Sequence, residues 1–263
     1  MRILARYKNH LLVLFSILFW VGLWWLIAAL FQKPLLLPTP IGMLKALVRL
    51  AKTGEFYLTL LLSLSRILLG IVAALLFGAL LALLTVKSSF CHHLFSPLLN
   101  LFKATPVASV IFLLLLWVGR DWVPALIAFM MALPIVWGNV REGLLSTDRQ
   151  LLEMAQIFRV PTSRVLLQIR IPSLKSYFLA AARSSIALAW KAGIAAEVLA
   201  TPARSIGGAI YEGKQFLLTD ELFAWTFIVV LLSILIEWVA LHLLKKSKGE
   251  ASNTAKQPGE VEA

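Results

Sequence analysis

The sequence predicts an all-α, polytopic membrane protein, and two observations carry that prediction. Of the 263 residues, 60% are hydrophobic, and the mean hydropathy is +0.87. Apolar residues fill nearly the whole chain, whereas a soluble domain of this length would alternate buried and solvated faces. Several uninterrupted apolar runs also reach the roughly 20 residues with which a helix crosses a hydrocarbon core of about 30 Å.

The apolar runs predict about six transmembrane helices. The first run is preceded by Arg2, Arg6 and Lys8, as the core of a signal peptide would be. It is too long for such a core, and no small-residue cleavage site follows it, so we expect an uncleaved first span. The fourth run is short and contains Pro134, which leaves its ends open. The expected spans are 11–31, 64–86, 96–118, 122–139, 177–199 and 222–244.

The net charge of +12 resides mainly in the segments that connect these runs. Cytoplasmic segments of membrane proteins hold the excess of Lys and Arg. With the N-terminus inside, the inner segments hold fourteen of these residues and the outer segments hold seven, which predicts cytoplasmic N- and C-termini. Because no basic face is interleaved with aromatic residues, we expect contact with membrane lipid and no nucleic-acid binding.

Residue patterns typical of catalysis or metal binding are missing from the sequence. The single cysteine, Cys91, excludes an internal disulfide, and the adjacent His92 and His93 cannot face one metal ion from a regular helix. The chain contains no GxxxxGK[ST] phosphate-binding loop, no nucleophile elbow and no HExxH sequence. We therefore expect no catalytic residue, no metal site and no cofactor bound by this chain.

The outer segment after the first span predicts an amphipathic helix at the membrane surface. It begins with a Pro-Thr-Pro turn, and Ile41, Leu44 and Leu47 follow near helical spacing with Lys45 offset from them. Gly54 is expected to stop this helix. Both a docking element and a merely interfacial helix are compatible with the pattern.

The cytoplasmic segment 146–172 predicts a helix, a break and a second helix. Within "LLEMAQIFRVPTSRVLLQIRIP", Leu151 and Ala155 can share one helical face, and Thr147 or Asp148 can cap the start. The Val-Pro step at 160–161 is expected to break the helix, because the residue before a proline disfavours the α conformation. A second helix is expected to run to about residue 170, before Pro172 turns the chain into the fifth span.

This segment resembles the EAA motif of permease subunits in binding-protein-dependent ATP-binding-cassette importers. That motif reads E-A-A, three residues, G, nine residues, I-x-L-P. Here Glu153 and Ala155 take its first and third positions, Arg159 takes the glycine position, and Ile169 and Pro172 begin and end its last part. The stretches "LSLSRILLGIVAALLFGALLALL" and "LAWKAGIAAEVL" also look like the nitrate, sulfonate and taurine branch of these permeases.

The resemblance implies a type I importer permease bundle over residues 1–246, in the bacterial inner membrane. It implies a dimer of ATPase subunits that binds ATP, a second permease copy, and an extracytoplasmic binding protein that delivers a small solute such as a sulfonate or nitrate. The five motif residues would then form the coupling element that contacts the ATPase. If the motif glycine serves a positive φ, Arg159 strains the turn by roughly 1 kcal/mol, unless Pro161 builds the break differently.

Ionisable residues inside the spans are candidates for a translocation pathway. A charge at the centre of a membrane helix costs about 2.5 to 3.5 kcal/mol on insertion scales, so it normally faces a bundle interior or water. Lys191 and Glu197 lie in the fifth span, six residues apart and therefore on different faces, so we expect partners on other helices. Arg66, near the outer end of the second span, is a candidate with a structural role as the stronger alternative.

Three further expectations concern the last third of the chain. Pro202 and the Gly207-Gly208 pair indicate an outer gating segment or an ordinary loop. The polar tail 247–263 is expected to be disordered. A secondary transporter driven by an ion gradient is the alternative function, but it requires intramembrane carboxylates, and Glu197 is the one good candidate.

Overall fold

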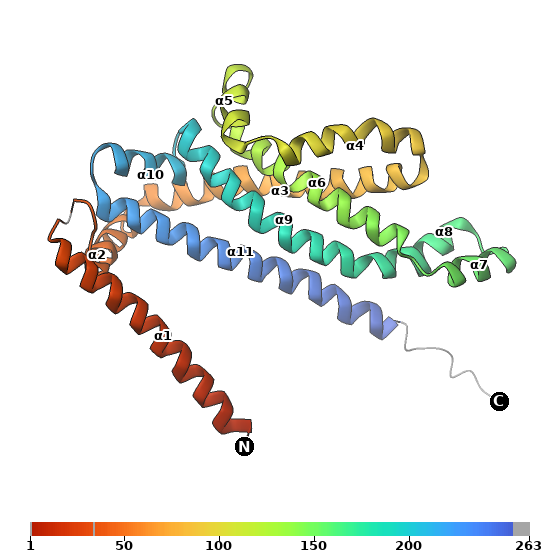
Figure 1. Cartoon of the computed structure of the whole chain (residues 1–263), viewed down its shortest axis with the longest axis horizontal. Helices are drawn as coiled ribbons and strands as arrows, with labels where there is room; N and C mark the ends of the chain where they lie inside the picture. The colour runs from red at the N-terminus through yellow and green to blue at the C-terminus, as the bar shows by residue number, and fades with distance from the viewer. Residues whose placement is uncertain (1, 34, 255–263) are drawn as a thin grey trace.

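The computed structural model describes residues 2–33 and 35–254, and this part of the chain is helical with no strands. Figure 1 shows α3, α6, α9 and α11 running along the long axis, with α2 and α10 at one end and α7 and α8 at the other. The helices are α1 (Arg2–Phe31), α2 (Pro40–Ala51), α3 (Gly54–Lys87), α4 (Ser89–Ala104), α5 (Val107–Trp117), α6 (Val123–Leu145), α7 (Arg149–Ile157), α8 (Thr162–Val165), α9 (Ile171–Ala200), α10 (Ile206–Gln215) and α11 (Thr219–Thr254), with a π-helical turn at Leu166–Arg170.

The core of the bundle is α6, which packs against α3 on one side and α9 on the other. Its buried side chains include Val136 and Val140, which meet Ile67 of α3 and Trp190 of α9 in one apolar cluster. A Cβ atom at Gly70 would overlap the backbone of Ala125, so glycine permits the close crossing of α3 and α6. Small residues at such crossings are the usual means by which membrane helices pack tightly.

Four helical segments are long and apolar enough to cross a membrane: 11–31, 54–87, 123–145 and 219–240. The first of them, within α1, diverges from the bundle (Figure 1). It is almost wholly exposed and meets the remainder chiefly where Trp24 stacks on Phe223 at a centroid distance of 5.8 Å. The prediction of a multi-pass, all-α protein is confirmed. Two of the six expected spans, 96–118 and 177–199, do not form the single apolar helices that were predicted.

The expected third span, 96–118, is not one straight helix. The chain bends by 109° between α4 and α5, and the pair counts as a fifth membrane crossing only if both helices form one broken span. Thr105 and Pro106 lie at the break with extended backbone angles. Pro106 lacks an N–H group, and its ring disfavours the α conformation of Thr105, which accounts for the bend.

The expected fifth span, 177–199, lies within α9 but is not among the helices that qualify by apolarity. Its sequence contains Arg183, Lys191 and Glu197. Arg183 donates from Nε to Glu237 of α11 at 2.8 Å, which pairs one of these charges. The helix tolerates its polar content because α3, α6, α10 and α11 surround much of it.

The helix expected after the first span is confirmed as α2, with one buried and one exposed face, and it is capped by Thr39, whose hydroxyl accepts from the amide of Gly42 at 3.1 Å. The expected stop at Gly54 is wrong, because α2 ends at Ala51 and Gly54 is the first residue of α3. At the other end of the chain, α11 continues to Thr254, so residues 247–254 of the expected disordered tail are helical. Residues 255–263 lie outside the described part.

Candidate functional site

The segment formed by α7, α8 and the π-helical turn projects past the ends of the long helices (Figure 1). Asp148 caps α7, and its carboxylate accepts from the amide of Gln150 at 2.9 Å, which selects Asp148 from the two expected caps. Glu153 is exposed on α7, whereas Ala155 is buried. The expected helix and break are therefore present, and α7 ends at Ile157.

The break after α7 is a turn with Arg159 in the left-handed conformation, at φ 51°. The amide of Arg159 donates to the carbonyl of Gln156 at 3.1 Å, and the amide of Val160 donates to that of Ala155 at 2.9 Å. This pair of bonds is the Schellman pattern, which normally places glycine at the left-handed position. Of the two alternatives for this motif position, the structure shows the positive φ, and an arginine adopts it.

The remaining motif residues lie where the second half of the segment joins α9. Ile169 is half-buried in the π-helical turn, and Pro172 is exposed in the first turn of α9. The expectation that Pro172 turns the chain is wrong, because helical structure continues from Thr162 to Ala200. Proline is tolerated in a first turn, where its missing N–H would have no intrahelical partner.

A hollow of about 510 Å³ separates this segment from the end of α3. Its walls include Lys87 from α3, Leu152 and Ala155 from α7, and Arg170 from the π-helical turn. The Nε atom of Arg170 is buried and makes no hydrogen bond among the described residues. The segment thus combines a fixed turn with a partly open underside.

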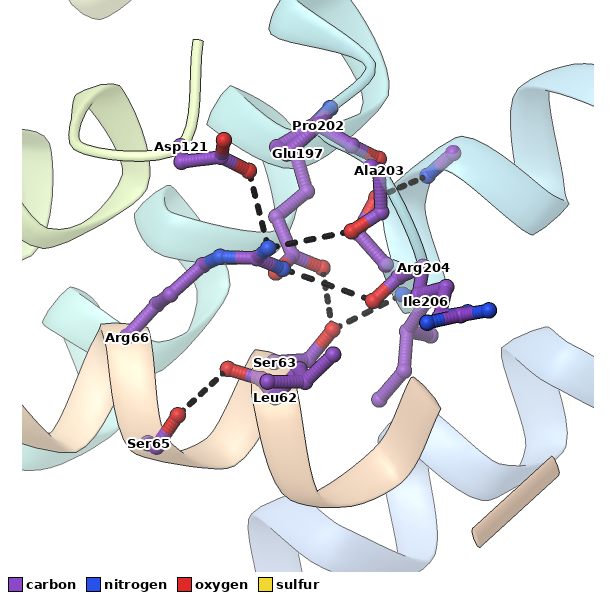
Figure 2. Close-up of polar contacts among 12 residues, drawn as sticks. Leu62, Ser63, Ser65, Arg66, Asp121, Glu197, Pro202, Ala203, Arg204 and Ile206 are labelled. Atoms are coloured by element: carbon purple, nitrogen blue, oxygen red, sulfur yellow. Dashed lines mark hydrogen bonds and ion pairs between the residues drawn. The ribbon is translucent and has the colours of Figure 1, made fainter. Parts of the chain in front are cut away.

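The opposite end of the bundle holds a polar junction around Glu197, which is fully buried. Figure 2 shows Glu197 and Ser63 meeting beneath the turn that leads from α9 to α10. The Ser63 hydroxyl and the amide of Gly207 donate to one Glu197 carboxylate oxygen, at 2.9 and 3.0 Å. The amide of Ile206 donates to the Ser63 hydroxyl at 2.8 Å.

The Glu197 junction caps the N-terminus of α10. The first amides of a helix lack intrahelical acceptors, and a carboxylate there is also stabilised by the helix dipole. A Cβ atom at Gly207 would overlap Glu197 and the backbone of Val198, so glycine is needed for this approach. The expectation that Glu197 finds partners on other elements is confirmed, and α10 is an ordered helix instead of an ordinary loop.

Arg66 ties three segments together at the same end (Figure 2). Its guanidinium donates to Asp121 at 2.8 Å and to the carbonyls of Ala203 and Arg204 at 3.0 and 3.4 Å. These contacts link α3 to the segment before α6 and to the turn before α10. They use the guanidinium as a structural clamp, as the stronger of the two sequence interpretations expects.

Lys191 lies on the exposed face of α9 and makes no hydrogen bond or ion pair within the described residues. The exposed positions of this face follow helical spacing: Ser184, Leu188, Lys191 and Ala195. The structure therefore separates the three ionisable candidates: Arg66 and Glu197 stabilise the junction, and Lys191 points away from the core.

Several residues that build these features were not singled out from the sequence. No local sequence pattern predicts the contacts of Ser63 and Asp121, because each forms a hydrogen bond with a side chain far away along the chain. Lys103, within the expected span 96–118, and Arg183 do carry a signal: both are charges inside predicted membrane helices, the same criterion that selected Lys191.

Known permeases share sequence with most of this chain. It is 25% identical to the taurine transport system permease protein of Escherichia coli (strain K12), over 81% of this chain and 80% of the relative. It is 25% identical to a putative aliphatic sulfonates transport permease protein of Bacillus subtilis (strain 168), over 78% and 74%. It is 26% identical to the formylaminopyrimidine transport permease protein of Halalkalibacterium halodurans, over 64% and 67%.

A family model supports the same assignment independently of individual relatives. It describes the inner membrane component of binding-protein-dependent transport systems and matches residues 67–249. The matched region contains α6, the whole α7–α8 segment, α9 and α10. The chain therefore belongs to the family of binding-protein-dependent transport system inner membrane components, the permease subunits of ATP-binding-cassette importers.

Proposed function

We propose that this permease subunit pairs with a second copy and carries a small sulfonate or related anion across the inner membrane. Its family implies an ATPase partner and a solute-binding protein, and it excludes the alternative of a secondary transporter. The proposed substrate class rests on the taurine and aliphatic sulfonates named for two relatives. The formylaminopyrimidine relative does not support this substrate class, because its named solute is not a sulfonate.

The geometry of the α7–α8 segment supports a role for it in coupling to the ATPase. In this proposal the ATPase subunit, and not this chain, binds the ATP. The turn at Arg159 fixes the angle between two short helices by backbone bonds, so the segment can transmit force through a small contact area. Its position at the end of the bundle exposes Glu153, Arg159 and Pro172 to a partner. In the proposed orientation this end, and both chain termini, are cytoplasmic.

The exposed face of α9 supports a role for Lys191 in the translocation pathway. A lysine facing hydrocarbon would cost about 2.5 to 3.5 kcal/mol on insertion scales, so this face is better suited to water or to a second copy. Ser184 and Ala195 on the same face are small, which permits another helix to approach closely there, and Leu188 offers an apolar contact. In a dimer with Lys191 at the interface, its ammonium would attract a passing anion weakly.

Uptake by vesicles that contain this chain with its ATPase and binding protein tests the proposal. Taurine and an alkanesulfonate should be accumulated in an ATP-dependent manner, and formylaminopyrimidine should not. We expect Glu153→Ala to lower uptake and substrate-stimulated ATP hydrolysis together, since it alters the proposed ATPase contact. Lys191→Gln should lower uptake while the subunits still co-purify.

Matched controls separate these roles from general damage. Lys214→Gln removes an exposed cation from α10 and is expected to preserve uptake. Glu212→Ala removes an exposed carboxylate from the same helix and controls for Glu153→Ala. Normal ATP coupling in Glu153→Ala would contradict the coupling role, and normal transport kinetics in Lys191→Gln would contradict the pathway role.

A further inference from the structure

A cluster of basic side chains surrounds Trp137 of α6, toward the end of the bundle that carries α7. The ammonium nitrogen of Lys103 and the guanidinium carbon of Arg141 each lie 6.0 Å from the indole centroid. The imidazole of His92 stacks on the same indole at a centroid distance of 6.1 Å and an interplanar angle of 18°. Two helices, α4 with His92 and Lys103 and α6 with Arg141, thus place three nitrogen-bearing groups around one aromatic side chain.

The indole at the centre of this cluster is fixed in place. Its Nε1–H donates to the hydroxyl of Thr85 at 2.9 Å, and that hydroxyl in turn donates to the carbonyl of Ala82 at 3.1 Å. Trp137 and Thr85 are both buried. The aromatic platform is therefore rigid, and a stacked or cationic group beside it is held at a defined position.

The basic groups around the indole lack the partners that buried polar atoms normally have. Nδ1 of His92 and Nε of Arg141 are buried, and neither makes a hydrogen bond among the described residues. Lys103 and Arg141 form no ion pair with any described carboxylate. The nearest candidate in sequence, Glu142, is exposed and forms no ion pair with Arg141. Buried groups of this kind are usually satisfied by protein, water or a ligand.

A hollow of about 510 Å³ opens beside Arg141 and Trp137. Its lining is Trp137, Gly138, Arg141, Glu142, Leu145 and Ser146, all from α6 and the residue that follows it. Arg141 therefore belongs both to the basic cluster and to the wall of the hollow. A group that entered there would meet the guanidinium, the face or edge of the indole and the hydroxyl of Ser146.

We propose that His92, Lys103 and Arg141, arranged around Trp137, form a binding site for a tetrahedral oxyanion, a phosphate or a sulfonate group. A guanidinium offers several donors in a fixed plane that suits such oxygens, and an ammonium adds a second charge. His92 contributes a ring nitrogen that donates in the tautomer protonated at Nδ1. This site is separate from the α7–α8 segment and from Lys191, and it does not depend on the proposed substrate.

Two sources can supply this chemistry: the phosphate of an anionic phospholipid, or a free oxyanion in solution. Basic pockets between membrane helices are a recognised setting for lipid headgroups. The test therefore uses two probes on the purified full-length chain. Native mass spectrometry counts phosphatidylglycerol retained after extraction from nanodiscs made with this lipid. Calorimetric titration with sodium sulfate and sodium ethanesulfonate, in lipid-free detergent against sodium chloride, measures free anions.

The variants are Arg141→Gln and Lys103→Gln, with Arg141→Lys as the conservative change and Lys214→Gln as a distant control that also removes one cation. We expect the first two to weaken binding of the effective probe by about tenfold, because each removes a charge-assisted bond. Arg141→Lys should retain an intermediate affinity, and Lys214→Gln should bind as the wild type does. Lys103 is exposed, so its variant decides the outcome if Arg141→Gln fails to fold.

Each result of this experiment decides the proposal. Selective loss of phosphatidylglycerol from the variants supports the site and identifies a lipid headgroup as its occupant. Selective weakening of sulfate or ethanesulfonate binding supports the site with a free anion. If neither probe binds the wild type more tightly than Lys103→Gln, the proposal is overturned. Because no ATPase or binding protein is present, this failure is distinguishable from a failure of the proposed transport function.

Discussion

At the end of the bundle formed by α2 and α10, the buried donors around Glu197 find their acceptors inside the chain, whereas toward α7 several buried nitrogens do not. Glu197, Ser63 and the first amides of α10 bond one another, whereas one Glu197 oxygen and the indole nitrogen of Trp24, beside α2, lack a hydrogen bond within the described residues. Toward α7, buried nitrogens of His92, Arg141 and Arg170 have no such partner.

This difference indicates which end is complete in a single chain. A buried donor without an acceptor costs about 1 to 3 kcal/mol, so a chain that leaves several at one end gains stability when another group reaches them. In the Glu197 junction the Ser63 hydroxyl and the amides of Ile206 and Gly207 all have acceptors, and these bonds hold α9, α10 and α3 together. The unpartnered nitrogens toward α7 fit the two proposals made for this end of the bundle, the coupling segment and the oxyanion site.

Glu197→Ala should produce the largest effect on stability, because it removes the acceptor shared by Ser63 and Gly207. Two buried donors would lose their partner, and we expect a loss of about 3 kcal/mol in unfolding free energy. Thermal unfolding of the purified chain in detergent measures it, with Glu212→Ala as a control that removes an exposed carboxylate from α10. Equal midpoints for these two variants would show that the junction is not a stabilising element.

Gly207→Ala should have the next largest effect, since its methyl group would overlap Glu197 and the backbone of Val198. Overpacking of this kind costs typically 1 to 3 kcal/mol, and we expect about 2 kcal/mol here. Gly138→Ala is the matched control: nothing lies within 4 Å of a Cβ at that position in α6, so alanine should leave stability unchanged or raise it slightly. A loss of equal size in both variants would remove the argument for close packing at the junction.

Much of the fold follows from the sequence because apolar runs of roughly 20 residues fit helices, which satisfy their own backbone hydrogen bonds in lipid. The effect of each proline is less predictable from the sequence. Pro97 and Pro134 lie inside α4 and α6 without ending them, whereas Pro106 accompanies a bend of 109°. Membrane helices tolerate proline when neighbouring groups satisfy the freed carbonyl, and the sequence alone does not reveal those neighbours.

The polar junction could be predicted only in part. The charge of Glu197 inside a span indicated a buried partner, but Ser63 lies 134 residues away, and no local pattern joins the two. Backbone turns were a second difficulty, because Arg159, Thr201 and Leu217 all adopt positive φ. Glycine or asparagine is usual at such positions. A turn formed by another residue can therefore be predicted only where a motif, as at Arg159, marks the position.

Arg159→Gly should have the smallest effect, and its sign differs from that of the two junction variants. Glycine adopts φ 51° without the clash that a Cβ causes, so the turn should become more stable by roughly 1 kcal/mol. Hydrogen exchange at the Val160 amide, which donates to Ala155, should slow by about fivefold. Arg164→Gly is the matched control in α8, where helical geometry predicts a loss instead of a gain.

The same pair of variants asks what the arginine side chain contributes at the α7 end. If Arg159→Gly stabilises the turn and leaves ATP-coupled uptake intact, the backbone geometry alone serves the ATPase contact. If the turn is stabilised but uptake falls, the exposed guanidinium of Arg159 itself takes part in the ATPase contact at the α7 end. Unchanged exchange at the Val160 amide would contradict the inference that the positive φ of Arg159 strains the turn. The difference between the two ends of the bundle would then be supported only by the unpartnered nitrogens toward α7.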